Sequence, residues 1–364
     1  MLISFVIPTR NRSAELGFTL GQLEKLDIED LGDQSEVVIV DNGSNTSIDV
    51  PAELSNGIRV IRVGLNENIG AGARNIGVAH AGGQWIIMLD DDSNLLPGPV
   101  GAYISGLEPS IGAVGGEIFL PGGRHEAGGL PEVIVGCGCA IRRDVFLEIG
   151  GYDARFGYYA EEYDLCAKLI SNGYRIKHTD ALGFIHRKCA TGRDMDEILF
   201  RLVRNNGWVI QRYAPDEQLD NALTEMKRRY KLIADNEQAI EGYQRGIDEL
   251  NRTIDYQDRV ALGIFEWERF VGLSAMRISI EPMLQEHASG RAVIVGPARG
   301  KGLGQIRGVI ESCGVTIIDD GGDANDLQVI GTLSPGPMLD ARNAYPDAIC
   351  PWMIEELALT ESQV

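Results

Sequence analysis

The sequence lacks long hydrophobic runs and is poor in basic residues. No apolar stretch reaches the roughly 18 residues that a membrane-spanning helix needs. There are 33 Lys and Arg against 53 Asp and Glu, which gives a formal net charge of −20. From the lack of a long apolar run we expect no transmembrane segment. Because nonspecific binders of nucleic acid or anionic membranes are usually basic, we also expect no nucleic-acid partner.

Cysteine is also sparse, and its spacing is irregular. The six cysteines are Cys137, Cys139, Cys166, Cys189, Cys313 and Cys350. The first two lack the two-residue gap of usual zinc pairs, and no second pair follows, so zinc is disfavoured. The opening residues, MLISFVIPTRNR, do not have the basic leader of a secretory signal. We expect reduced thiols in a cytoplasmic protein.

Strand-like and helix-like segments alternate through the first third of the chain. Apolar runs at 2–8, 36–44, 58–63 and 85–89 are typical of buried strands, whereas residues 13–26 and 69–81 are helix-like. This alternation predicts an α/β fold with a mostly parallel sheet. Ligands of such sheets bind beyond the carboxyl ends of the strands, where Asp41 and Asp90 lie. Further helices are expected at 142–149, 161–172 and 196–213, around a glycine-rich stretch at 112–138.

The remaining third has a different pattern. Residues 217–286 are charged and carry apolar residues at three–four spacing. They predict helix packed on its own chain, or alternatively a coiled-coil contact that makes a homo-oligomer. Strand patterns at 291–296, 315–319 and 327–331 and a helix pattern at 303–313 predict a small α/β unit. We expect three parts, comprising residues 1–215, 216–287 and 288–364.

The stretch GPARGKG at 296–302 resembles a phosphate-binding loop only superficially. Gly296 and Gly300 are separated by three residues instead of four, and no Ser or Thr follows Lys301. A Walker motif is therefore excluded, and the glycine spacing does not predict NAD. A glycine-rich turn before a helix can still bind an anion or a sugar.

In WIIMLDDDSN, residues 85–94, an apolar strand runs into three consecutive aspartates. Like charges this close are destabilising unless a cation lies among them. Asp90 and Asp92 point the same way in an extended backbone, and two carboxylates suit Mg²⁺ or Mn²⁺. The alternative is a solvated acidic turn or helix N-cap.

Several motifs surround these aspartates in the sequence. FVIPTRNR lies near the start, VVIVDNGSN at 37–45 and NENIGAGARNIGVAHAGGQWIIMLDDD at 66–92. Together they resemble glycosyltransferase family 2. The segment from GCGCAIRRDVF to GFIH at 136–186 resembles the acceptor half of this family, and RLVRNNGWVIQRYAP resembles its closing segment. The resemblance covers roughly residues 1–215. It implies a GT-A catalytic domain, which is Rossmann-like, and a nucleotide-sugar donor linked to UDP, dTDP or GDP.

The resemblance also implies site residues. Those expected to bind the nucleotide sugar are Pro8, Thr9, Arg10, Asp41, Asn68, Gly70, Arg74, Asn75, Asp90 and Asp91. Those expected to hold a divalent metal, Mg²⁺ or Mn²⁺, are Asp90, Asp92 and His186. Structural alternatives are a turn-forming role for Asp41 and a surface position for Arg74.

A catalytic base must take the proton of the attacking acceptor hydroxyl. Glu162, in AEEYDL, stands where the family has an aspartate, and Glu161 and Asp164 are the other candidates. The alternative is that these acids stabilise a helix N-terminus. The acceptor, a carbohydrate or other small molecule, is expected near Gly115, Gly116, Gly136 and Gly138, which otherwise form tight turns.

These residues predict an inverting glycosyltransferase with a metal and a carboxylate base. A nucleotidyltransferase is a weaker alternative, because PTRNRSAELG lacks the glycine-rich loop with Arg and Lys common in that class. A catalytically inactive relative that binds sugar or serves assembly is the other alternative.

Overall fold

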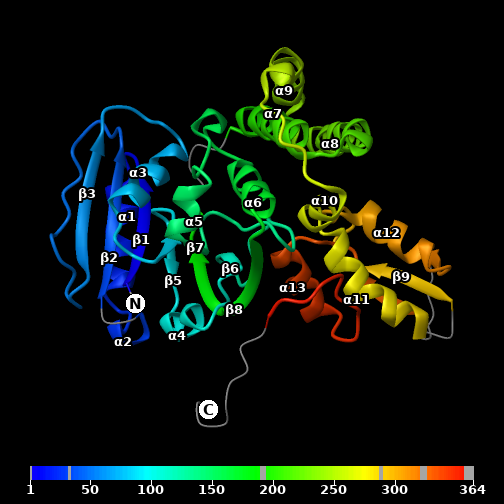
Figure 1. Cartoon of the computed structure of the whole chain (residues 1–364), viewed down its shortest axis with the longest axis horizontal. Coiled ribbons are helices and arrows are strands. Elements are labelled where there is room, and N and C mark those ends of the chain that lie inside the picture. Colours follow the sequence, from blue (N-terminus) through cyan, green and yellow to red (C-terminus); the bar gives the residue numbers. More distant parts are fainter. Residues whose placement is uncertain (1, 32–33, 189–193, 287–289, 320–325, 356–364) are drawn as a thin grey trace, which may run out of the picture.

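An eight-stranded sheet forms the framework of the N-terminal half (Figure 1). The computed structural model describes residues 2–31, 34–188, 194–286, 290–319 and 326–355. The strands are β1 (Leu2–Thr9), β2 (Gln34–Asn42), β3 (Arg59–Leu65), β4 (Trp85–Met88), β5 (Ser93–Leu95), β6 (Ile111–Phe119), β7 (Cys139–Arg142) and β8 (Arg175–His186), in the order β3-β2-β1-β4-β7-β6-β8-β5. Strands β1 to β4 are parallel and β6 is parallel to β8, while β7 and β5 pair antiparallel. The predicted mostly parallel α/β fold is confirmed.

Alternate side chains of the central strands pack into two cores, one on each face of the sheet. Phe5 and Ile7 of β1 lie in one core with Leu20, whereas Val6 lies in the other with Val78. Burial on both faces explains why these strands are continuous apolar runs. The helices of this half are α1 (Ser13–Leu23), α2 (Ile28–Leu31), α3 (Gly72–His80), α4 (Val100–Ser105), α5 (Arg143–Glu148) and α6 (Glu161–Ser171), with a single 3₁₀ turn, η1 (Ala154–Phe156).

The glycine-rich stretch 112–138 contains most of β6, a strand that its composition did not predict. Glycine usually indicates a turn. Here Gly116 allows β6 to approach β8, because a Cβ at this position would lie 2.3 Å from the carbonyl oxygen of Leu182. The glycine therefore serves close packing of two strands.

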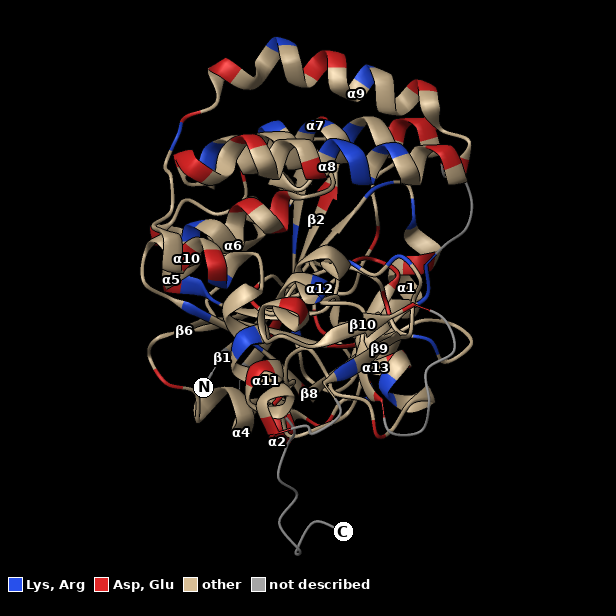
Figure 2. Cartoon of the chain, turned by 90° about the vertical axis from the view of Figure 1, so that its right-hand side faces the viewer, with Lys and Arg blue, Asp and Glu red and all other residues tan. Residues whose placement is uncertain are grey.

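Three helices form a layer at one end of the molecule (Figures 1 and 2). They are α7 (Met195–Tyr213), α8 (Asp216–Glu237) and α9 (Ile240–Thr253), which is followed by a 3₁₀ turn, η2 (Ile254–Tyr256). Gly207 of α7 is packed against Leu250 of α9, since a Cβ there would lie 2.4 Å from the leucine side chain. The chain reverses at Gln238, which has a left-handed backbone with φ of 56°. Helices α10 (Ile264–Phe270) and α11 (Leu273–Glu286) follow. The region 217–286 is thus helical, as predicted, and packs on its own chain.

A second, smaller sheet lies near the C-terminus. Its parallel strands β9 (Arg291–Val295), β10 (Thr316–Ile318) and β11 (Leu327–Ile330) have the order β10-β9-β11, with helices α12 (Leu303–Ser312) and α13 (Pro335–Ala344). This confirms the small α/β unit, although α13 was not predicted. Helix α13 contacts both β11 and β6, so it lies between the two sheets (Figure 1).

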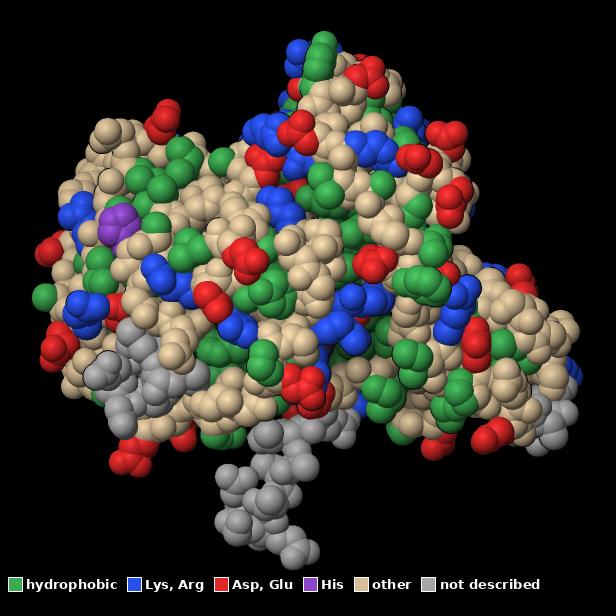
Figure 3. Space-filling view, in the orientation of Figure 1, with side chains coloured by type: hydrophobic (Ala, Val, Ile, Leu, Met, Phe, Trp, Pro, Cys, Tyr) green, Lys and Arg blue, Asp and Glu red, His purple; other side chains and the backbone are tan. Residues whose placement is uncertain are grey.

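Charged side chains of both signs lie on the surface (Figure 3). On the face shown in Figure 3, acidic and basic side chains are interspersed. Among the described residues, no helix is both long and apolar enough to span a membrane.

Candidate functional site

The carboxyl edge of the large sheet gathers the loops that follow β1, β2 and β4. Thr9 at the end of β1 is paired in register with Asp41 at the end of β2. The Thr9 hydroxyl donates a hydrogen bond of 2.9 Å to Oδ2 of Asp91, beyond β4. Three segments that are far apart in the sequence therefore meet at one edge, as expected for parallel strands.

Two arginines neutralise the three aspartates. Arg74 of α3 forms an ion pair with Asp90. Arg12 reaches both of the others, with 2.9 Å from Nη1 to Oδ1 of Asp91 and 2.7 Å from Nη2 to Oδ2 of Asp92. Arg12 was not among the predicted site residues, although it stands in the quoted motif FVIPTRNR.

Burial and neighbouring charges act in opposite directions on the pKa of Asp91 and on that of Arg74. Burial raises the pKa of Asp91 to about 7, against the lowering effects of Arg12 and the Thr9 hydrogen bond. Arg74 is only 6% exposed, and the nearby Asp90 carboxylate raises its pKa despite the opposing effect of burial. Arg74 is therefore a buried partner of the strand-end carboxylate of Asp90, and the alternative of a surface position for Arg74 is wrong.

His186, at the end of β8, lies among ligand-type side chains. Its Nε2 is 3.4 Å from Oδ1 of Asp92, and its Nδ1 is 2.8 Å from Oε2 of Glu126 and 3.5 Å from Sγ of Cys137. Burial lowers the pKa of His186, but these hydrogen bonds outweigh burial and raise that pKa to about 12.

Oxygen, nitrogen and sulfur donors converge here. One ligand atom each from Asp90, Cys137 and His186 lies within 4.8 Å of the others. This set shares two members with the predicted metal ligands and contains Cys137 where Asp92 was expected. With Asp92 at the same imidazole, the donors fit a divalent cation that accepts carboxylate and imidazole, such as Mn²⁺.

The other predicted nucleotide residues line the neighbouring loops. Asp41 accepts a hydrogen bond of 3.0 Å from the Ser44 backbone, which is a turn-forming contact. Arg10 is exposed and donates to the carbonyl of Gly43, while Pro8 is partly buried. Asp41 therefore shapes the loop after β2, and Arg10 is left at the surface of that loop.

The loop 66–70 before α3 is held by hydrogen bonds. Asn42 donates to Oδ1 of Asn68 at 2.9 Å and to the carbonyl of Gly70 at 3.2 Å. Gly70 has φ of 61°, and a Cβ there would lie 2.4 Å from the carbonyl oxygen of Gly157, so only glycine fits. Asn75 exchanges two hydrogen bonds with the Tyr152 backbone, which is a structural role within the described residues.

The start of α6 presents two neighbouring carboxyl groups, of which Glu161 is buried and Glu162 is partly buried. Glu162 accepts a hydrogen bond of 3.2 Å from the Gly136 backbone, and Oε2 of Glu161 has no hydrogen-bond partner among the described residues. Burial raises the pKa of both groups. The preceding residues Tyr159 and Ala160 have left-handed backbones with φ of 72° and 63°. Such strain is often stored at functional sites.

Asp164, one turn further along α6, has a different environment. It is fully buried, and its Oδ1 lies 2.7 Å from Arg212 and 2.8 Å from the Tyr213 hydroxyl of α7. Lys168 lies 2.7 Å from its Oδ2. These partners describe an ion pair that joins α6 to α7.

The predicted acceptor glycines are mostly packing positions. A Cβ at Gly115 would lie 2.5 Å from the His178 ring, and one at Gly138 would lie 2.7 Å from Ile118. Gly116 packs on β8, as described above. Gly136 differs, because a Cβ there would lie 2.6 Å from Oε1 of Glu162. Of these four glycines, Gly136 is the one beside a candidate catalytic side chain.

The fold and the aspartates at its strand ends define a GT-A-type protein. Comparison with known proteins gives the family: residues 4–108 match the model of glycosyl transferase family 2. The chain thus carries a domain of glycosyltransferase family 2.

One curated relative and several solved structures are similar to parts of this chain. An uncharacterised glycosyltransferase of Haemophilus influenzae is 26% identical over 194 residues, which is 46% of this chain and 62% of that relative. The structure of GalNAc-T7 with UDP, GalNAc and Mn²⁺ superposes with a TM-score of 0.52 at 18% identity, over 70% of this chain and 57% of the other. S. aureus TarS 1–349 with UDP-GlcNAc gives 0.50 at 17% identity, over 86% and 91%. At these identities the structures show a shared fold.

Proposed function

We propose that this chain is a glycosyltransferase that transfers a sugar from a nucleotide-diphosphate donor to an acceptor hydroxyl, with inversion at the anomeric carbon. One observation carries the proposal: the aspartates after β4, His186 and Glu162 at the start of α6 are joined by short contacts. Asp92 contacts His186, and Glu162 accepts a hydrogen bond from the amide of Gly136, the residue before Cys137 of the donor set. A donor site and a proton acceptor are thus adjacent.

The donor half of the reaction uses the strand-end residues. Asp90, Asp92 and His186, with Cys137 beside them, would hold Mg²⁺ or Mn²⁺, which when bound neutralises a departing diphosphate. Arg74 lies buried next to Asp90, where its guanidinium can also face phosphate oxygens. Thr9 and Asp41 line the edge on the nucleotide side.

The acceptor half uses Glu162. Its Oε1 is held by the Gly136 amide, and its Oε2 takes the proton of the attacking hydroxyl. Burial raises the pKa of Glu162 toward neutral pH, and a pKa near the working pH suits a general base. Asp164 is a weaker candidate because Arg212 and Lys168 occupy its carboxylate. The acceptor is a carbohydrate or another hydroxyl-bearing small molecule.

A sugar-binding subunit without turnover is the second candidate function. The observation that favours it is that Arg12 and Arg74 form ion pairs with all three aspartates. Such pairing can neutralise the three aspartates without a metal ion.

Thermal unfolding with nucleotides separates these functions. We expect UDP, which is present in the GalNAc-T7 structure and is the nucleotide of UDP-GlcNAc in the TarS structure, to stabilise the chain with Mn²⁺ by about 2.7 kcal/mol at a hundredfold excess over its dissociation constant. GDP, dTDP and CMP are compared in parallel. Asp92→Asn should remove the metal-dependent part, and the exposed-site control Asp235→Asn should not. Turnover of the stabilising donor class then identifies an enzyme. Binding without turnover supports the second candidate, and no binding at millimolar nucleotide contradicts both.

A further inference from the structure

The segment 125–129, between β6 and β7, contacts the C-terminal unit through its backbone. The amide of Gly128 donates to the Ser334 hydroxyl at 3.0 Å, and that hydroxyl donates to the Gly128 carbonyl at 2.5 Å. Lys301, in the loop before α12, donates a hydrogen bond of 3.2 Å to the Gly129 carbonyl. Two elements of the C-terminal unit thus hold one short loop.

Asp340 of α13 adds a charged contact at the start of the same loop. Its Oδ1 lies 2.6 Å from Nδ1 of His125 and accepts a hydrogen bond of 3.2 Å from the His125 amide. Nε2 of His125 lies 2.7 Å from Glu117 of β6. The buried imidazole therefore bridges α13 to the large sheet, and its raised pKa follows from these two carboxylates outweighing burial.

Glu126, the next residue, faces the candidate metal site. Its Oε2 lies 2.8 Å from Nδ1 of His186, and its Oε1 lies 2.7 Å from Nζ of Lys188. Its backbone rests on α13, because a Cβ at Gly336 would lie 2.1 Å from the Glu126 carbonyl oxygen. Glu126 thus connects α13 to the imidazole of His186.

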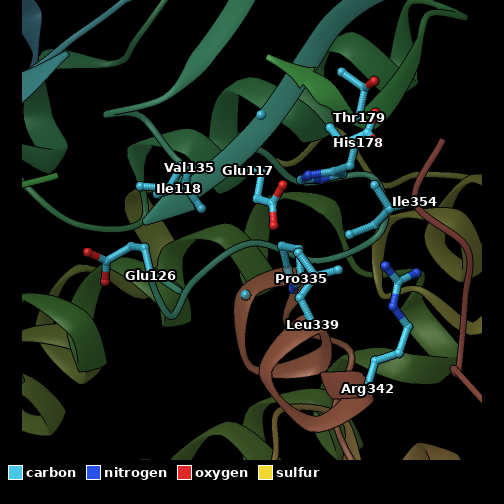
Figure 4. Close-up of a pocket in the computed structure, with 13 residues that line it drawn as sticks. Glu117, Ile118, Glu126, Val135, His178, Thr179, Pro335, Leu339, Arg342 and Ile354 are labelled. Carbon is cyan, nitrogen blue, oxygen red and sulfur yellow. The ribbon is translucent and has the colours of Figure 1, made fainter. Parts of the chain in front are cut away.

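A cavity of about 90 Å³ lies beside this connection. Figure 4 shows Glu126 at one end and Arg342 and Ile354 at the other, with Pro335 and Leu339 of α13 facing Glu117. The polar contacts of Ser334 and Asp340 with the loop 125–129 therefore lie beside open space at this interface.

We propose that Asp340 and Ser334 are positioning residues for His186, acting through the loop 125–129 and the carboxylate of Glu126. The proposal rests on the proposed function, in which His186 belongs to the metal site. The C-terminal α/β unit thereby orients a ligand of the catalytic domain. Partners that orient a metal-bound imidazole typically change metal affinity 10–100-fold when they are removed.

The direct test is ¹⁵N NMR of the histidine rings in the metal-free full-length chain, with the His186 signals assigned by their loss in His186→Gln. Asp340→Ala should shift the ring-nitrogen signals of His186, although the two residues do not touch. Asp340→Asn, which keeps an acceptor for the His125 amide, should restore much of the wild-type spectrum. Asp319→Ala is the matched control, because Asp319 pairs with Arg307 on α12.

Mn²⁺ binding, followed by electron paramagnetic resonance, is the second readout. We expect Asp340→Ala and Ser334→Ala to weaken Mn²⁺ binding at least about tenfold, with kcat at saturating Mn²⁺ largely kept. Unchanged His186 signals in a folded Asp340→Ala protein would overturn the proposal. If the His186 signals shift but even the wild-type chain binds no Mn²⁺, the positioning contact stands and the proposed metal-assisted function fails.

Discussion

The carboxyl edges of the two sheets are built alike and used differently. Both are parallel α/β edges at which a glycine-rich loop leads into a helix, NIGAGARN before α3 and GPARGKG before α12. At the large sheet, Arg74 and Asp90 bring opposite charges together. At the small sheet, Gly300 lies against the backbone that follows β11, because a Cβ at Gly300 would be 1.9 Å from the Gly331 carbonyl oxygen. The comparison teaches that the topology allows a site and that the side chains decide whether one exists.

Lys301 shows what the small edge does instead. Its amino group hydrogen-bonds to Gly129 and Tyr163, which belong to the N-terminal half of the chain. Burial lowers the pKa of Lys301 to about 7. A lysine that binds phosphate is charged and faces the ligand. Lys301 instead faces Gly129 and Tyr163, so the carboxyl edge of the small sheet packs against the N-terminal half of the chain.

The largest effect is expected at the large edge. Glu162→Gln should lower kcat by roughly 10²–10⁴-fold, because an amide cannot accept the proton of the acceptor hydroxyl. Donor binding in thermal unfolding should be unchanged, since the shape of the side chain is kept. Steady-state turnover checks this, with Glu148→Gln on α5 as the exposed control. A Glu162→Gln enzyme with near-normal kcat would move the base to Glu161.

The second effect separates the two faces of α6. Asp164→Ala should destabilise the fold by about 3 kcal/mol, because it leaves buried Arg212 with Asp153 as its remaining ion-pair partner and removes the partner of the partly buried Lys168. Urea unfolding measures this change. Asp235→Ala, which breaks the exposed pair with Lys231, should change stability by less than about 1 kcal/mol. Similar values for both variants would show that Asp164 is not a structural ion-pair residue.

The smallest effect concerns Lys301. The pKa of Lys301 falls from 10.5 to about 7 on folding, so the unfolded chain holds more protons on this side chain between those values. Its contribution to stability therefore rises with pH over that window and is smallest below about pH 7. Lys301→Met should remove this rise. Urea midpoints at about pH 7 and 9 test it. If the urea midpoint changes equally with pH in wild type and Lys301→Met, the lysine does not titrate as a buried group. Lys231→Met is the exposed control.

Much of the fold could be predicted, because hydrophobic periodicity is local. The runs that became β1, β2 and β4 are continuous since both sheet faces are covered. Strand β6 was missed, because glycine at positions such as Gly116 indicates a turn unless the neighbouring strand is known. Helix α13 was missed as well; its first residues, Pro335 and Gly336, look like a loop, although proline is favoured in a first helical turn.

The candidate site was predicted in part. Asp90, Asp92 and His186 could be named from motifs, and the structure places them at one edge. Arg12 and Glu126 were not named, because their roles depend on contacts across 80 and 60 residues of sequence. Nothing in the local sequence marks Glu126 as the partner of an imidazole.

By itself, the sequence determined the strands, most helices and the acidic segment after β4, because these depend on neighbours a few residues away. Only the tertiary structure decided which charges are paired. Arg12 meets Asp91 and Asp92 because β1 and β4 are adjacent parallel strands. Asp340 reaches His125 because α13 packs on β6. Burial then sets the ionisation of each group, and burial is a property of the packed chain.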